Sequence, residues 1–170
     1  VMEAELGNAD RLRLIRSECT SVYHGVPSVI QFLLDEASGR ADCLAGVRRL
    51  AYGGAAMPTA TIERILREWP WIEQVQVWGM TESGPGGAWL PPAWLPAKAG
   101  AIGHAMPYCE LQVRDESGQA TPRGEVGELW FRGPSMASGY WDDPTATAQA
   151  FRDGWLRSGD LVVEDPDGLL

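Results

Sequence analysis

Residues 10–79 alternate between helix-like and strand-like segments, and this alternation limits the possible folds more than any other feature of the chain. The helix-like segments repeat apolar residues three and four positions apart, whereas the strand-like segments are short, apolar and end at glycine. A strand–helix–strand–helix–strand order at this spacing predicts a parallel sheet with right-handed crossover connections. The predicted helices are residues 10–17, 26–37 and 58–69, and the predicted strands are residues 20–25, 47–54 and 72–79.

After residue 101 the pattern changes to short strand-like segments that are separated by turn-forming residues. One helix is expected in this part, with Asp143 as its N-cap and Pro144 at its first position. We therefore predict an α/β fold in which a partial parallel β/α subdomain is followed by a small β-rich, barrel-like subdomain. The expected parts are an α/β subdomain at residues 1–88, a proline-rich linker at 89–100 and a β-rich subdomain at 101–170.

Composition excludes several classes of protein. The net charge of −9 provides no basic face of the kind that binds nucleic-acid phosphates. The longest apolar runs are too short to cross a bilayer. The three cysteines, Cys19, Cys43 and Cys109, are too widely spaced to suggest a disulfide framework or a zinc site. We expect a cytoplasmic protein with no nucleic-acid partner and no membrane span.

Three glycine-bearing segments follow the predicted parallel strands, namely "HGV" at residues 24–26, "GGAAMP" at 53–58 and "WGMTESGPGG" at 78–87. The carboxyl ends of parallel strands lie along one edge of a sheet, where ligands bind, and glycine lets the backbone approach a ligand closely. The third segment also carries an indole, a hydroxyl and a carboxylate. The alternative, that the glycines only end strands and begin helices, remains open at each position.

Three stretches, "GGAAMP", "WGMTESGP" and the long run from "GELWFRG" through "GYWDDP" to "RSGDLVVEDPDG", resemble successive core motifs of the adenylate-forming superfamily. This superfamily includes acyl- and aryl-CoA synthetases, amino-acid adenylation domains and luciferases. The resemblance extends over nearly the whole chain, in the order of the family, and is greatest to fatty-acyl-CoA ligases. It implies ATP-dependent activation of a carboxylic acid as an acyl-adenylate, followed by transfer of the acyl group to the thiol of coenzyme A. The implied cofactors and co-substrates are ATP or AMP, Mg²⁺ and coenzyme A.

The resemblance also implies a role for each matching residue. Thr81 would donate its hydroxyl to the α-phosphate, and Glu82 would be a Mg²⁺ ligand; we predict both as catalytic. Asp160 would accept hydrogen bonds from the two ribose hydroxyls, since a carboxylate offers two acceptor oxygens to a vicinal diol. The other residues expected at the nucleotide are Gly53, Gly54, Ala55, Trp78, Gly79 and Met80, with the Trp78 ring lying against the adenine. Those expected at the carboxylic acid are His24, Gly25 and Gly84.

Each of these residues also has a structural interpretation. Trp78 also suits a core position at a strand end, Thr81 a turn cap and Asp160 a turn before a strand. His24 is as well explained by a structural role as by a place in the acid pocket. Tyr140 and Trp141 are interpreted as scaffold of the β-rich part.

The family's glycine-rich phosphate loop, which ends near a lysine, has no counterpart here, because the single lysine, Lys98, lies in the proline-rich segment. A C-terminal domain with a catalytic lysine is likewise expected beyond this sequence. We therefore expect the chain to be a fragment that needs the missing parts of the same protein and is inactive alone. The acid is expected to be fatty or otherwise apolar. An aryl-CoA ligase, an amino-acid adenylation domain and a non-catalytic nucleotide- or acyl-binding module remain alternatives.

Overall fold

The computed structural model describes residues 6–170, which form two compact units, each built from two separate stretches of the chain. The first unit contains the residues up to Gln76 together with Pro91–Gly100. The second contains Val77–Leu90 and Ala101–Leu170. The predicted division at residues 88 and 100 rests on composition rather than on spatial contacts, and it stays a prediction.

The first unit carries three parallel strands, because β1 and β3 both pair with β2 in the same direction. Gly25 at the end of β1 is in register with Tyr52 at the end of β2, and Tyr52 is in register with Gln76 of β3. The predicted parallel α/β arrangement is therefore confirmed. The elements are α1 (Asn8–Ser17), β1 (Val22–Gly25), α2 (Pro27–Ala37), η1 (Ala41–Leu44), β2 (Arg49–Tyr52), α3 (Thr59–Glu68), β3 (Glu73–Trp78, whose last two residues belong to the second unit) and η3 (Pro92–Trp94).

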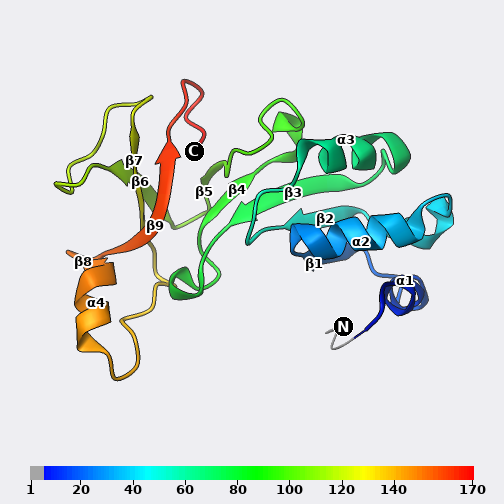
Figure 1. Cartoon of the computed structure of the whole chain (residues 1–170), viewed down its shortest axis with the longest axis horizontal. Helices are drawn as coiled ribbons and strands as arrows, with labels where there is room; N and C mark the ends of the chain where they lie inside the picture. The colour runs from blue at the N-terminus through cyan, green and yellow to red at the C-terminus, as the bar shows by residue number, and fades with distance from the viewer. Residues whose placement is uncertain (1–5) are drawn as a thin grey trace. The chain divides into compact units, whose positions relative to one another are not determined.

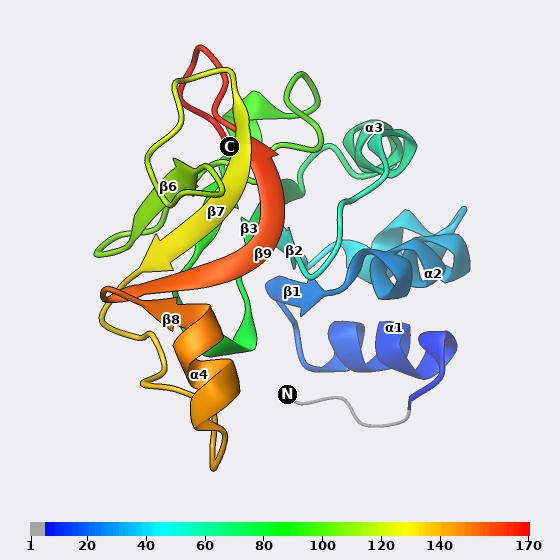
Figure 2. The ribbon, with the colours of Figure 1, turned by 60° about the vertical axis from the view of Figure 1, so that its left-hand side comes forward.

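The helices α1, α2 and α3 lie on the same side of these strands (Figure 2). This placement is what right-handed crossovers produce when the strands follow each other in sequence order. Each helix turns one apolar face to the strands, and those faces share one core with β1 and β2. The fully buried core residues are Ile30, Leu33, Leu34, Ala37, Leu44, Val47, Leu50, Tyr52, Ile62 and Ile65.

The second unit is mainly antiparallel. Its four-stranded sheet has the order β6-β7-β9-β8. β9 bends strongly along its length (Figure 1), and so does β7 (Figure 2). This curled sheet confirms the predicted β-rich, barrel-like part. The elements are η2 (Thr81–Ser83), β4 (Ala88–Leu90), β5 (His104–Ala105), β6 (Glu110–Arg114), β7 (Val126–Arg132), α4 (Pro144–Ala150), β8 (Phe151–Arg152) and β9 (Trp155–Val163).

The predicted start of the helix in the second unit is confirmed. The side chain of Asp143 caps α4 by accepting a hydrogen bond from the Ala146 N–H at 2.8 Å, and Pro144 opens the helix. Trp155 of β9 is buried in this unit, with only 5% of its surface exposed. The guanidinium of Arg114 covers it and the neighbouring Trp130, at 4.5 and 4.4 Å from the two ring centroids.

The strand β4 differs from the prediction, which assigned residues 89–100 to a proline-rich linker. Ala88 and Trp89 of β4 pair with Ala105 and His104 of β5 in antiparallel register. Strands of two or three residues are too short for an alternating pattern to be recognised in the sequence.

Among residues 6–170, no helix combines the length and apolar character that a membrane span would need.

Candidate functional site

The second unit brings together two of the predicted site residues that are far apart in the sequence. The indole Nε1–H of Trp78, at the end of β3, donates a hydrogen bond to Oδ2 of Asp160 in β9 at 2.8 Å. Each Asp160 oxygen has two lone pairs, so this bond leaves acceptor capacity on both oxygens. The sequence predicted a flat platform at Trp78, but not that its edge would hold the carboxylate of Asp160.

Asp160 lies in an irregular part of β9. Arg157 pairs with Trp130 of β7 and Leu161 pairs with Glu128, so that the three residues 158–160 of β9 face the single residue 129 of β7. This is a β-bulge, a feature that re-aims a side chain within a sheet. Gly159 adopts φ +78° in the bulge, a conformation that glycine adopts without steric cost. The motif "RSGD" is therefore the sequence of a bulge that presents Asp160.

The short helix η2 holds Thr81 and Glu82 and is organised around Ser83, which is fully buried. The Ser83 hydroxyl accepts the Met80 N–H at 3.1 Å and lies 2.9 Å and 2.8 Å from the carbonyl oxygens of Met80 and Gly86. The Ser83 side chain thus connects the two ends of the turn, at Met80 and at Gly86. Thr81, at the start of η2, is exposed.

Residues 135–140, which we call the clasp, bind η2 at three points. The Ser135 hydroxyl donates to the Ser83 carbonyl oxygen at 2.7 Å, and the Ala137 N–H donates to the Glu82 carbonyl oxygen at 2.8 Å. The phenolic O–H of Tyr140 donates to Glu82 Oε1 at 2.6 Å. The clasp therefore fixes both the backbone and the carboxylate of Glu82.

Gly84 shows how closely the clasp approaches η2. It has φ +62°, and a Cβ built there would lie 2.6 Å from the carbonyl oxygen of Ser135. This contact accounts for the glycine structurally, while its predicted place at the carboxylic acid stays a prediction. Gly79 and Met80 lie between β3 and η2, where the chain passes from Trp78 to Thr81.

Tyr140 is the site residue that the sequence reasoning missed, because it was interpreted as scaffold. The hydrogen bond that Tyr140 donates to Glu82 favours the neutral phenol and raises its pKa above the ordinary value, with burial and the charge of Glu82 adding smaller contributions. Nothing in the spacing of "GYWDDP" indicates a partner that precedes it by 58 residues. The scaffold interpretation is wrong for Trp141, which is 98% exposed.

Five predicted site residues lie in the first unit. Gly53, Gly54 and Ala55 directly follow β2, and Gly54 adopts φ +79°. His24 and Gly25 end β1, which is in register with β2. The carboxyl ends of these two strands therefore meet at one edge of the sheet, as predicted. Their roles at a ligand stay predictions.

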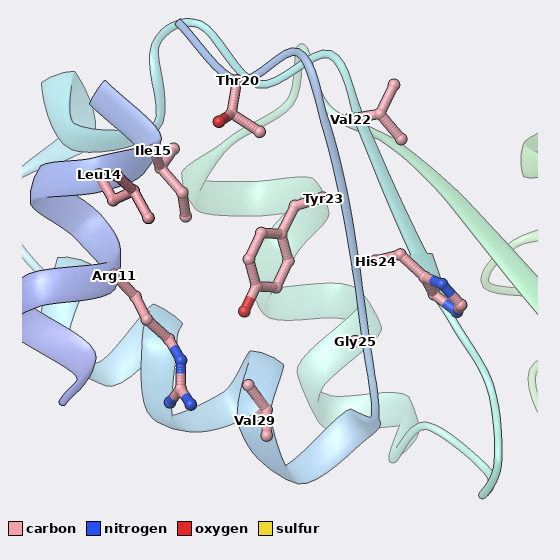
Figure 3. A pocket seen from close by; sticks show the side chains of 9 residues that line it. All are labelled: Arg11, Leu14, Ile15, Thr20, Val22, Tyr23, His24, Gly25 and Val29. Carbon is pink, nitrogen blue, oxygen red and sulfur yellow. The ribbon is translucent and has the colours of Figure 1, made fainter. Parts of the chain in front are cut away.

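A pocket of about 470 Å³ is lined by β1 and the residue Thr20 before it, together with residues of α1 and α2. Figure 3 shows Tyr23 and His24 pointing to opposite sides of β1, as neighbouring residues of a strand do. Tyr23 extends toward the helices, with its hydroxyl directed to the region of Arg11 and Val29. His24 belongs to the lining of this pocket, which neither confirms nor contradicts its predicted place at the carboxylic acid.

Glu82 is the residue predicted to hold Mg²⁺. Among residues 6–170 no group of three or more His, Cys, Asp or Glu side chains is arranged to hold a metal ion. Mg²⁺ is commonly bound by one or two carboxylates while substrate phosphates and water supply its other ligands. Tyr140 occupies Oε1 only, and Oε2 of Glu82 accepts no hydrogen bond from the described part of the chain. One hard oxygen is therefore present, which fits a cation that arrives with a nucleotide.

Comparison with known proteins is consistent with this geometry. Residues 2–141 match the model of the family described as AMP-binding enzyme. The feruloyl-CoA synthase of an Amycolatopsis species is 35% identical over 92% of this chain and 32% of its own length. The medium/long-chain-fatty-acid–CoA ligase FadD8 of Mycobacterium tuberculosis is 32% identical over 99% of this chain and 30% of its own length.

A solved structure gives the same result for the fold. The o-succinylbenzoate CoA synthetase (MenE) of Bacillus subtilis, in complex with its acyl-adenylate intermediate OSB-AMP, superposes with a TM-score of 0.86 and is 26% identical. The match covers 97% of this chain and 33% of that one. The chain thus spans about a third of the length of the relatives it matches. With a family match over residues 2–141, the chain belongs to the family of AMP-binding enzymes.

Proposed function

We propose that this chain carries the AMP-recognition part of an ATP-dependent acid–CoA ligase. The observation that carries the proposal is the hydrogen bond from Trp78 to Asp160, because it joins the "WGMTE" segment to the "RSGD" bulge in one site. The named activities of the feruloyl-CoA and fatty-acid–CoA relatives, and the acyl-adenylate bound by MenE, support the reaction class. Because the chain spans about a third of these relatives, we propose that it works within a longer protein.

The proposed reaction needs two charged groups to meet, since a carboxylate oxygen attacks the α-phosphate of ATP. Pyrophosphate leaves, and the acyl-AMP then has a leaving group that a thiol can displace. The barrier comes mainly from charge repulsion and from positioning, so hydrogen-bond donors and fixed substrates supply most of the catalysis. Mg²⁺ would neutralise phosphate charge when it is bound.

The roles we propose combine the resemblance to the family with the two contacts described above. Asp160 accepts from the ribose hydroxyls while Trp78 holds one of its oxygens, and the Trp78 ring faces the purine. Thr81 donates its hydroxyl to the α-phosphate. Glu82 would supply a carboxylate oxygen to the cation, while Tyr140 holds Oε1 of the same side chain. Gly53, Gly54 and Ala55 line the adenine side.

For the acid we propose an apolar carboxylic acid, because the segments "VYHGVPSVIQFLL" and "GPGGAWLPPAWLP" are apolar and contain no acidic residue placed to meet an amino group. A fatty acid is the first candidate. An aromatic acid is the second, and the similarity to a feruloyl-CoA synthase favours it specifically.

The complete protein encoded by the gene should be tested for formation of AMP and pyrophosphate from ATP with a panel of fatty, aromatic and amino acids. The panel should be run with and without coenzyme A. We expect pyrophosphate release with one apolar class of acid and a thioester product only when coenzyme A is present. Nucleotide binding without turnover of any acid would favour the non-catalytic module instead.

Replacing Trp78 by phenylalanine tests the hydrogen bond to Asp160, because phenylalanine keeps an aromatic face but has no N–H donor. We expect the affinity for AMP to fall about threefold to tenfold, the value of one lost hydrogen bond, while the melting temperature changes little. Equilibrium binding of AMP measures the effect. Trp89→Phe, at the 38% exposed Trp89 of β4, is the matched control. Equal AMP affinities in Trp78→Phe and wild-type protein would contradict the proposed role.

Replacing Tyr140 by phenylalanine tests the clasp. The variant keeps the ring, which packs edge-on against Phe151 at 5.7 Å, but releases Glu82 Oε1. We expect the adenylation rate to fall about threefold to tenfold, and half-maximal rate to need more Mg²⁺, because the carboxylate is less well oriented. Tyr108→Phe, at a residue that is 90% exposed, is the control. An unchanged Mg²⁺ dependence in Tyr140→Phe would show that Glu82 needs no such support.

A further inference from the structure

We propose that Ser158 and Glu128 are positioning residues that set the direction of the Asp160 carboxylate through the bulge in β9. Neither residue is expected to touch the nucleotide. The inference rests on the proposed function, because it assumes that Asp160 binds the ribose. It follows from the side-chain hydrogen bonds of Ser158 and Glu128, which hold the bulge where the regular pairing of β7 and β9 is interrupted.

Ser158 ties the bulge to β7 and supports Asp160 directly. Its hydroxyl donates to the Leu129 carbonyl oxygen at 2.7 Å and accepts the Asp160 N–H at 3.0 Å. Leu129 is fully buried, so this end of the contact is fixed in the core. One side chain therefore connects a rigid position of β7 to the backbone of the residue whose carboxylate must be aimed.

Glu128, which like Leu129 belongs to β7, supports the middle of the bulge. Its Oε1 accepts the Gly159 N–H at 3.1 Å. Its Oε2 accepts from Nε and a terminal nitrogen of Arg157 at 3.0 and 2.8 Å, and from Trp130 Nε1 at 3.3 Å. The Glu128 side chain is only 17% exposed, and charged groups in such contacts make strong hydrogen bonds.

Arg157 and Trp130 in turn hold Glu128 in one orientation. The Arg157 guanidinium lies 5.6 Å from the Trp130 ring centroid, and the Trp130 ring is itself buried beneath Arg114. The carboxylate of Glu128 is thus held by Arg157 and by Trp130, independently of its contact with Gly159. Gly159 has no side chain of its own to restrict it, so we infer that its conformation depends on this contact and on Ser158.

A carboxylate that accepts from two hydroxyls of one ribose needs a defined direction. When the bulge loosens, the carboxylate can keep a hydrogen bond to one ribose hydroxyl more easily than to both. A single hydrogen bond tolerates a wider range of carboxylate orientations than two bonds made at once. Loss of positioning therefore reduces the preference for AMP over 2′-deoxy-AMP. General destabilisation of the protein would lower the affinity for both nucleotides equally and leave their ratio unchanged.

The test compares the complete wild-type protein with Ser158→Ala, Glu128→Ala and Asp160→Ala by equilibrium binding of AMP and of 2′-deoxy-AMP. We expect Ser158→Ala and Glu128→Ala to bind AMP about threefold to tenfold more weakly, with most of the loss confined to AMP. Glu110→Ala is the matched control. Glu110 binds Arg132 through both oxygens at 2.6 and 3.0 Å on the same sheet, but has no hydrogen bond to residues 158–160.

The outcomes separate the two proposals. If Asp160→Ala binds both nucleotides as the wild-type protein does, the ribose role and the proposed function at this residue fail. If Asp160→Ala loses the preference for AMP but Ser158→Ala retains it in full, the positioning role is overturned while the ribose role stands. Ser158→Ala decides the question even if Glu128→Ala fails to fold, because it removes one oxygen atom and leaves the Glu128 contacts in place.

Discussion

Replacing Glu82 by alanine is expected to lower the rate of acyl-adenylate formation in the complete protein about 100-fold to 1000-fold at saturating ATP, the size of effect found when one preorganised electrostatic contact is removed. We propose that the Glu82 carboxylate supplies a hard oxygen ligand to the cation that accompanies the phosphates. Its loss also leaves the Tyr140 hydroxyl without its acceptor at 2.6 Å. Pyrophosphate release measures the rate.

The affinity for AMP should change much less in the same Glu82→Ala variant, because AMP lacks the two phosphates that leave. Glu82→Gln is expected to be nearly as slow, since an amide oxygen carries no charge to complement the cation. Glu63→Ala, on the exposed side of α3, serves as the control. A Glu82→Ala protein that retains a third or more of the wild-type rate would remove Glu82 from the proposed chemistry.

Replacing Asp160 by alanine has the second largest expected effect, on binding rather than on rate. We expect the affinities for ATP and AMP to fall roughly 10-fold to 100-fold, because hydrogen bonds to a charged acceptor are lost. The rate at saturating ATP should fall far less, since the ribose lies away from the reacting phosphate. Equilibrium binding and the dependence of rate on ATP concentration measure the two effects separately.

Asp160→Asn provides the sharper version of this test. Its carbonyl oxygen would take the place of Oδ2 and accept from the Trp78 N–H, which leaves its amide N–H groups toward the ribose. The diol would then lose its acceptor although the side chain has almost the same shape. We therefore expect Asn to bind AMP nearly as weakly as Ala. Wild-type affinity in Asp160→Asn would mean that the ribose does not bind here; Glu116→Ala, in an exposed turn, should change nothing.

The parallel part of the fold could be predicted because its signals are local and long enough to read. Helix α2 repeats apolar residues over Pro27–Ala37, and the three parallel strands each end near a glycine. The N-cap of α4 was predictable because Asp143 and Pro144 are adjacent to the helix that they begin. β4 was not predictable, because three residues carry no period and its pairing partner follows after a proline-rich segment.

The site was predictable only where a motif exists. Trp78 and Asp160 were predicted to share a ligand by resemblance, whereas their direct hydrogen bond spans 82 residues and depends on the bulge in β9. Tyr140 was missed because the local sequence is the same whether the tyrosine only packs or also donates a hydrogen bond to a distant residue. Such long-range contacts depend on tertiary structure, which local patterns do not encode.

The bulge in β9 also limits which lengths this segment can have. Three residues of β9 face one residue of β7, so β9 has two additional residues. An even number preserves the parity of the strand: Leu161 projects on the same side as Arg157. Deleting one residue would invert every side chain from there to Val163, whereas deleting two would restore a regular ladder. We therefore expect functional homologues to keep this length.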